Sequence, residues 1–281
     1  MATVQAGNAA VKRAAANPAL ELLERLGYAV RGALYAAMGL LALRIVFSVA
    51  GGQTTDLTGS LVFLIGNPFG KLVLIVAAVG LAAYSLWGFT RAIYDPLHRG
   101  SDASGYMARL GFVTSALSYA AIVFFALQIL AGSGASAADG TQKTVASVLT
   151  HPAGGPLTIL IGLVVIGVAL GQFLEAVRAT FARDLKGAEM SARTRATVVT
   201  LGRFGMFARG VIFLIIGWFV VQAGIHQDPA QAQGFGGAFV FLLAQPFGRI
   251  VMGIVALGFV ALGLHSFACA RWVRLMGTTP S

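Results

Sequence analysis

The sequence predicts an all-α, polytopic membrane protein built from three tandem two-helix repeats. Two observations lead to this prediction. First, 57% of the 281 residues are hydrophobic and only 11% are charged, whereas a soluble domain carries roughly 25% charged residues because its surface is solvated. Second, related sequence segments recur three times with a constant internal spacing. An ordinary soluble globular domain is therefore excluded.

Six apolar stretches are long enough to cross a bilayer as helices. A hydrocarbon core about 30 Å thick requires about 20 residues at about 1.5 Å per residue. The predicted spans are residues 32–50, 72–89, 110–130, 157–177, 210–223 and 250–270. The fifth is short unless it extends back to Phe204, which requires Arg209 to snorkel toward the headgroups. All six are rich in glycine and alanine, which favours close helix contacts in lipid.

The distribution of lysine and arginine predicts cytoplasmic termini. Of the 20 basic residues, four precede the first span, three lie between the second and third, seven between the fourth and fifth, and two after the sixth. The opposite side has only Lys71, Lys143 and Arg249, with Arg44 inside a span near that side. Loops rich in lysine and arginine remain in the cytoplasm. Topology alone therefore explains the net charge of +10, and no nucleic-acid partner is expected.

An internal repeat divides the six spans into three units. In the first and third units an Arg-Gly pair precedes the first span and a Pro-Phe-Gly segment precedes the second, and the middle unit has a weaker copy. The repeated residues are Arg31, Gly32, Pro68, Phe69 and Gly70; Pro152 and Gly154; and Arg209, Gly210, Pro246, Phe247 and Gly248. The proline follows 37 residues after Arg31, Ser115 and Arg209, respectively. Chance would not produce that spacing three times.

The repeat predicts the organisation of the whole chain. Residues 1–25 form a cytoplasmic tail without the apolar segment of a signal peptide. The three units are residues 26–94, 110–178 and 204–274, and residues 179–203 form a basic cytoplasmic connector, expected to belong to an amphipathic helix. Each unit contains two spans, so all three enter the membrane in the same orientation. Parallel repeats of this kind predict a pseudo-threefold arrangement about the membrane normal.

A short apolar segment lies in the outer loop of each unit, at residues 61–65, 145–149 and 239–243. Each segment is followed by a proline. Proline disfavours helix at the residue before it and suits the first turn of the helix after it. We therefore expect short interfacial helices in the outer loops, each of which breaks sharply into the second span of its unit.

These repeated residues resemble a bacterial membrane family described as domain of unknown function 1206. Its members carry tandem two-helix units with an Arg-Gly entry to the first helix and a Gln-Pro-Phe-Gly entry to the second. The resemblance extends over residues 26–274, although the middle unit departs from the pattern at Ser115-Ala116 and at Ala153. It implies a multi-pass protein of the bacterial plasma (inner) membrane, and it implies no particular activity.

Polar residues occupy one matching position in all three units, thirteen residues after Arg31, Ser115 and Arg209. They are Arg44, Gln128 and Gln222. An ionisable residue within a span is costly and therefore marks a candidate site. Two interpretations remain open. The three side chains form a polar ring that lines a vestibule on the outer side, or Arg44 snorkels to outer headgroups while the glutamines bond to neighbouring backbone.

Other candidate residues favour structural roles. Arg31 and Arg209 lie at the predicted cytoplasmic boundary, where an arginine anchors the topology or binds a lipid phosphate. His265, in the sixth span, has no histidine partner at helical spacing, so a structural contact is expected rather than metal binding. His151 precedes a repeated proline and is expected to cap backbone groups.

The sequence offers little for catalysis. Glu175 is the one carboxylate that touches a predicted span, and it is expected to pair with Arg178. Neither a nucleotide-binding glycine motif nor a catalytic triad pattern is visible. We therefore expect no enzyme, no catalytic or metal-binding residue and no cofactor.

Two functions remain as hypotheses. The first is a structural or interaction protein, whose partners are the lipid bilayer, anionic lipid headgroups or another membrane protein. It predicts a core that is closed along its axis. The second is a channel or transporter for a small solute, with an anion favoured by Arg44. It predicts a hydrated cavity around Arg44, Gln128 and Gln222.

Overall fold

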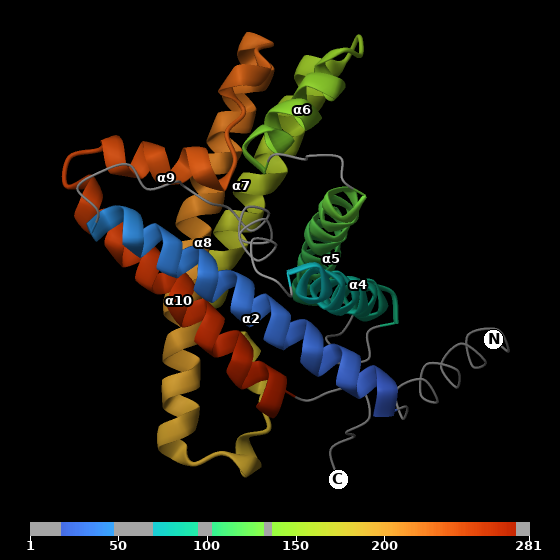
Figure 1. Ribbon diagram of the computed structural model, residues 1–281, viewed down its shortest axis with the longest axis vertical. Coiled ribbons are helices and arrows are strands. Elements are labelled where there is room, and N and C mark those ends of the chain that lie inside the picture. The colour runs from blue at the N-terminus through green and yellow to red at the C-terminus, as the bar shows by residue number, and fades with distance from the viewer. Residues whose placement is uncertain (1–17, 48–69, 95–102, 132–136, 274–281) are drawn as a thin grey trace, which may run out of the picture.

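The computed structural model describes residues 18–47, 70–94, 103–131 and 137–273, and this part of the chain is helical (Figure 1). The α-helices are α2 (Pro18–Phe47), α4 (Gly70–Tyr94), α5 (Ala103–Leu130), α6 (Ala137–Leu149), α7 (Gly154–Arg178), α8 (Ala192–His226), α9 (Phe235–Ala244) and α10 (Gly248–Trp272). Short 3-10 helices are η1 (Thr180–Asp184), η2 (Gly187–Glu189) and η3 (Pro229–Gln231). Within the described ranges the only β contact is an isolated bridge between Leu185 and Val273. The predicted all-α class is confirmed.

Four helical segments are long and apolar enough to cross a membrane. They are Arg25–Phe47 within α2, and the helices α7, α8 and α10. These four correspond to the first, fourth, fifth and sixth predicted spans. At the positions of the second and third predicted spans the structure has α4 and α5, continuous helices of 25 and 28 residues.

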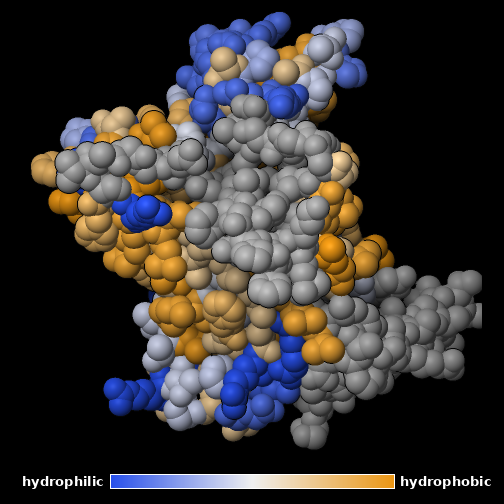
Figure 2. Space-filling view, viewed as in Figure 1, coloured by the Kyte–Doolittle hydropathy of each residue, from blue (hydrophilic) through white to orange (hydrophobic). Residues whose placement is uncertain are grey.

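The surface of the molecule is what a lipid environment requires. Figure 2 shows a band of apolar residues across the middle of one face, with hydrophilic residues gathered at both ends. Many large apolar side chains point outward; Val177 is 68% exposed and Leu160 is 57% exposed. Water would disfavour a contiguous apolar surface of this extent. The helices therefore present to lipid the side chains that a soluble protein would bury.

The most extensive helix contacts join one repeat unit to the next. The second helix of each unit packs against the first helix of the following unit, as α4 against α5, α7 against α8, and α10 back against α2. Figure 1 shows α2 and α10 side by side, crossing the bundle obliquely. Within units, α2 contacts α4 and α8 contacts α10, whereas α5 and α7 barely touch. The chain therefore returns on itself, from the third unit to the first.

Matching glycines set the helix separation at two of these interfaces. A Cβ atom on Gly39 of α2 would lie 2.7 Å from both the Ala256 oxygen and the Val260 nitrogen of α10. Gly217 of α8 occupies the corresponding position in the third unit, and its Cβ would lie 3.0 Å from the Gly162 oxygen of α7. The two interfaces thus use the same positions of the repeat. The expectation that glycine permits close contact between helices is met here.

The predicted breaks before the second spans are present in the second and third units. Helix α6 ends at Leu149 and helix α9 at Ala244, just before Pro152 and Pro246. The next helices begin at Gly154 and Gly248, where a Cβ atom would collide with carbonyl oxygens of the preceding short helix. The repeated glycine is therefore required by close approach of the backbone. In the first unit, Pro68 and residues 61–65 lie outside the described residues, and Gly70 begins α4.

The basic connector, residues 179–203, is not the amphipathic helix that we expected. It contains the 3-10 helices η1 and η2, and from Ala192 onward it is part of α8. Leu185 between the two short helices is buried, and the Lys186 amide donates to the Trp272 carbonyl over 2.7 Å. These contacts fix the connector against the end of α10, which a free-standing helix on the membrane surface could not achieve.

The end of α7 explains why the helix stops before the connector. Ala179 adopts a left-handed conformation with φ of 50°, which ends the helix. The Glu175 carboxylate accepts hydrogen bonds of 2.6 Å from the Thr180 hydroxyl and from the Phe181 amide. The expected ion pair between Glu175 and Arg178 is absent among the described residues, because the carboxylate is used to satisfy these donors.

The glycine contacts predict the effect of adding one methyl group. Gly39→Ala should destabilise the protein by about 1–3 kcal/mol, the usual range for overpacking, because the methyl group meets the α10 backbone. Gly253→Ala is the matched control, since its Cβ would lie 3.8 Å from the nearest atom. Thermal unfolding of the full chain in detergent should show a lower Tm for Gly39→Ala only. Equal Tm values for the two variants would contradict this packing.

Candidate functional site

Two arginines lie in the interior of the helical bundle. Arg31 is 9% exposed and Arg209 is 6% exposed. We expected both at a cytoplasmic boundary, where they would anchor the topology. Instead, α2 begins at Pro18 and α8 at Ala192, so each arginine lies more than three helical turns inside its helix. The longer helices carry both guanidinium groups into the core.

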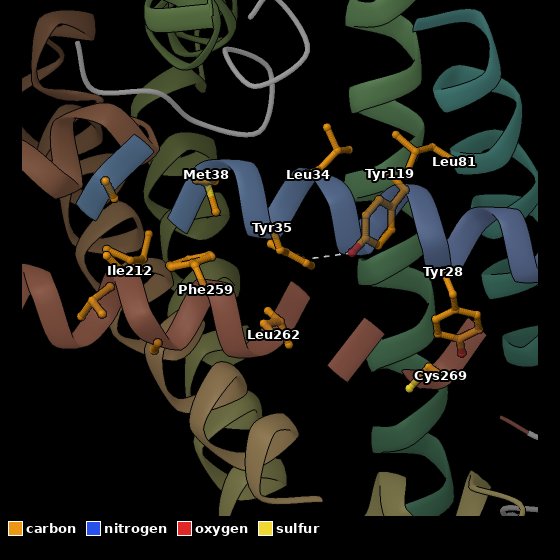
Figure 3. Packing of buried hydrophobic residues seen from close by; sticks show 14 of the residues in the cluster. Tyr28, Leu34, Tyr35, Met38, Leu81, Tyr119, Ile212, Phe259, Leu262 and Cys269 are labelled. Carbon is orange, nitrogen blue, oxygen red and sulfur yellow. Dashed lines mark hydrogen bonds between the residues drawn. The ribbon is translucent and has the colours of Figure 1, made fainter. Parts of the chain in front are cut away.

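Tyrosine side chains surround the Arg31 guanidinium. Its Nη1 donates a hydrogen bond of 2.7 Å to the Tyr84 hydroxyl of α4. Its Cζ atom lies 5.5 Å from the ring centroids of Tyr35 and Tyr84, and 5.8 Å from that of Tyr119. Figure 3 shows Tyr35 on α2 and Tyr119 on α5 pointing toward one another, with their hydroxyl oxygens 3.1 Å apart. Side chains from three helices thus enclose one cation.

Arg209 reaches the same group of rings from α8. Its Cζ atom lies 4.8 Å from the Phe213 centroid and 5.8 Å from the Tyr35 centroid. The Tyr35 ring therefore contacts both cations. A cation over an aromatic face gains about 2 kcal/mol when the contact is desolvated. We call Arg31, Tyr35, Tyr84, Tyr119 and Arg209 the arginine–tyrosine cluster.

The arginine–tyrosine cluster lacks negative charge within the described part of the chain. No described carboxylate forms an ion pair with Arg31 or Arg209. The Nε atoms of both arginines are buried and have no hydrogen-bond partner there. Buried cations are normally paired, because an unpaired charge in an apolar interior is costly. The cluster is thus the most unusual electrostatic feature of the described residues.

A second pair of arginines holds the ends of helices. Arg25 Nη1 donates to the Ala270 and Arg271 carbonyls at the end of α10, over 2.7 and 3.1 Å. Arg203 uses Nε and Nη2 in the same way on the last carbonyls of α7, over 2.8 and 3.2 Å. The last carbonyls of a helix lack backbone donors and carry partial negative charge. Each arginine therefore fastens the first helix of its unit to the preceding unit in space.

Arg44, Gln128 and Gln222 occupy the other matching position of the repeat. Arg44 is exposed in the last turn of α2, and Gln222 is half-buried in α8. Gln128 lies in α5, and its side chain is outside the described part of the structure. The polar ring of Arg44, Gln128 and Gln222 therefore stays a prediction.

The glycines of the Arg-Gly pairs are packing positions. The Cβ of Gly32 would lie 3.0 Å from the Gly263 oxygen, and that of Gly210 would lie 2.7 Å from the Phe173 ring. A larger residue at either position would push the neighbouring helix away.

The histidines make structural contacts. His265 is buried, and its Nδ1 donates to the Val198 carbonyl over 3.0 Å, while its Nε2 lies 3.4 Å from the Cys269 sulfur. His151 Nδ1 lies 3.2 Å from the Ser147 carbonyl, as expected of a residue that caps backbone. No group of three or more histidine, cysteine, aspartate or glutamate side chains that could hold a metal occurs in the described ranges.

Parts of this site could have been found by comparing the repeats position by position. Four residues after Arg31, Ser115 and Arg209 come Tyr35, Tyr119 and Phe213, all aromatic. Six residues before them come Arg25, Arg109 and Arg203, all arginine. Tyr84 has no polar counterpart in the other units, so no repeated signal marked it.

Comparison with known proteins identifies the family. A family model described as Domain of Unknown Function (DUF1206) matches residues 26–95, 110–179 and 204–273. The chain belongs to this family. Its three DUF1206 segments confirm the resemblance that the repeated motifs indicated. A Bacillus subtilis (strain 168) protein named "Uncharacterized protein YxxB" is 32% identical over 249 residues, which cover 89% of this chain and 90% of that protein. No solved structure matches.

The helix-end contacts of the DUF1206 units predict the result of removing one arginine. Arg203→Gln should destabilise the protein by about 1.5–3 kcal/mol, as expected for hydrogen bonds from a charged donor, because two carbonyls of α7 lose their partner. Arg193→Gln removes an exposed arginine of the same helix and should leave Tm unchanged. If both variants have the Tm of the wild type, Arg203 does not hold α7.

Proposed function

We propose that the protein is a non-enzymatic structural or interaction protein of the bacterial plasma membrane. In this proposal all six long helices span the bilayer, and the three DUF1206 units surround a pseudo-threefold axis. The repeated α4–α5, α7–α8 and α10–α2 contacts support such an arrangement, because each unit meets the next in the same order. The corresponding glycines at two of these interfaces support it further.

The observation that carries this proposal is the dense aromatic core. Tyr35, Tyr119, Phe239 and Phe259 are almost completely buried. The Phe259 ring lies 6.0 Å from Tyr35 and 5.9 Å from Phe239, centroid to centroid. These rings come from four different helices. A core packed in this way favours a closed protein over one with a hydrated channel.

An apolar hollow lies between three of the helices. It has a volume of about 260 Å³ and is lined by Ile166, Leu214, Ile215, Trp218 and Phe241 of α7, α8 and α9. Its lining has no charged residue that could attract a solute.

Transport of a small anion is the second candidate. The observation that favours it is the positive charge within the bundle, where Arg31 and Arg209 are buried without a described carboxylate. In this alternative an anion would pass from an outer vestibule near Arg44 to the arginine–tyrosine cluster. Gln128 and Gln222 would complete the polar lining.

The proposed topology can be tested on one helix. We expect the start of α8 in the cytoplasm and its end outside, because basic residues concentrate near its start. With Cys269→Ala as background, a membrane-impermeant maleimide should label His226→Cys on intact cells and leave Arg193→Cys unlabelled. Both original residues are exposed, so both cysteines should react after permeabilisation. Labelling of Arg193→Cys alone on intact cells would show that α8 has the opposite orientation.

A flux assay separates the two candidate functions. Liposomes that contain the purified full chain should lose chloride and phosphate no faster than empty liposomes, because the core is packed with aromatic residues. Anion release above this background that falls in Arg44→Gln would instead support the transporter. The Arg193→Gln chain, with an equal change in charge, is the control for the change in surface charge.

A further inference from the structure

We propose that the arginine–tyrosine cluster is a binding site for a phosphate group. This inference goes beyond the proposed structural role, since it requires binding but no transport. It rests on the hydrogen-bond donors of the cluster, on its charge and on its position along the helices.

The cluster contains more donors than acceptors. A guanidinium has five N–H donors and no acceptor, and the buried Nε atoms of Arg31 and Arg209 have no partner among the described residues. The Tyr84 oxygen accepts from Arg31, so its own proton remains available. One proton joins the Tyr35 and Tyr119 hydroxyls, which leaves the other free to donate. The two Nε–H groups therefore lack an acceptor among the described residues, and the tyrosine hydroxyls have protons that could be donated.

The charge of the cluster specifies an anion as that acceptor. Arg31 and Arg209 are each at least 91% buried, and no described carboxylate pairs with them. The aromatic rings compensate only part of the desolvation. A phosphate carries up to two negative charges and three strong acceptor oxygens, and the planar fork of arginine matches its geometry. A single phosphate group would supply both the missing charge and the missing acceptors.

The two cations share one aromatic neighbour, the Tyr35 ring. Their Cζ atoms lie 5.5 and 5.8 Å from the same Tyr35 ring centroid. The rings of Tyr84 and Tyr119 also lie near Arg31, with centroids 5.5 and 5.8 Å from its Cζ atom. The first helix of each of the three units contributes to the cluster. Tyr35 lies on α2, Tyr119 on α5 and Arg209 on α8.

The depth of the cluster is compatible with two sources of phosphate. Arg31 and Arg209 each lie six residues beyond Arg25 and Arg203, which contact the ends of α10 and α7. Six residues correspond to about 9 Å along a helix. An inorganic phosphate ion, or the phosphate of an anionic lipid headgroup, would therefore move only a short distance from the ends of α10 and α7 to the cluster.

The test measures the Tm of the purified full chain in nanodiscs. One arm uses phosphatidylcholine nanodiscs and compares sodium phosphate with sodium chloride at equal ionic strength, which holds screening constant. The other arm compares phosphatidylcholine nanodiscs with nanodiscs that also contain phosphatidylglycerol. A ligand that binds only the folded state raises Tm with its concentration. A rise in the first arm identifies free phosphate, and a rise in the second identifies a lipid headgroup.

Three variants connect a rise in Tm to the cluster. Arg209→Gln should abolish the rise, because it removes one of the two charges. Tyr84→Phe retains the ring beside Arg31 and loses one hydroxyl donor, so the apparent affinity should fall by about tenfold. Arg193→Gln removes an exposed arginine and should respond as the wild type does. If Arg209→Gln does not fold, the apparent phosphate affinity of Tyr84→Phe decides whether the cluster is the binding site.

The proposal is overturned if neither arm raises the Tm of the wild type. It is also overturned if Arg209→Gln and Tyr84→Phe respond as the wild type does, because the phosphate then binds elsewhere. Anion flux through liposomes would contradict the proposed structural role without contradicting this site. The two failures are therefore distinguishable.

Discussion

Close approach of helix backbones at small residues holds the described bundle together. Lipid removes most of the hydrophobic driving force between helices, so their association depends on van der Waals packing and hydrogen bonds. Gly39 and Gly217 provide that packing where α2 meets α10 and α8 meets α7. Because α10 returns to α2, the separation at these glycines also determines how tightly the core between the units is packed.

Arginines act at two levels of this arrangement. At the outer level, Arg25 and Arg203 satisfy the last carbonyls of α10 and α7, so a positive charge is used where a helix end is negative. At the inner level, Arg31 and Arg209 meet aromatic faces and hydroxyl groups rather than carboxylates. The outer arginines are satisfied by helix-end carbonyls, whereas the Nε atoms of the inner pair have no hydrogen-bond partner in the described part of the chain.

The comparison of sequence and structure shows where pattern reasoning succeeded. The long apolar stretches and the repeat predicted the all-α class, and the apolar segments followed by proline predicted the short helices α6 and α9 and their breaks near Pro152 and Pro246. These patterns did not predict that α2 and α8 begin well before Arg31 and Arg209. Hydropathy marks the apolar part of a helix, whereas polar turns at its start carry no such signal. For this reason, the predicted spans began beside these two arginines, although the helices extend further back along the chain.

The sequence by itself determined the helical class, the three repeats and the glycines that permit close packing, because each depends on local composition or on spacing along the chain. Only the tertiary structure decided which residues surround Arg31. Tyr84 and Tyr119 lie 53 and 88 residues from it in sequence. Tyr84 meets it because α2 and α4 of the first unit pack together, and Tyr119 meets it because the second unit packs against the first. The connector after Ala179 likewise took its form from contacts with α10, which local sequence preferences do not encode.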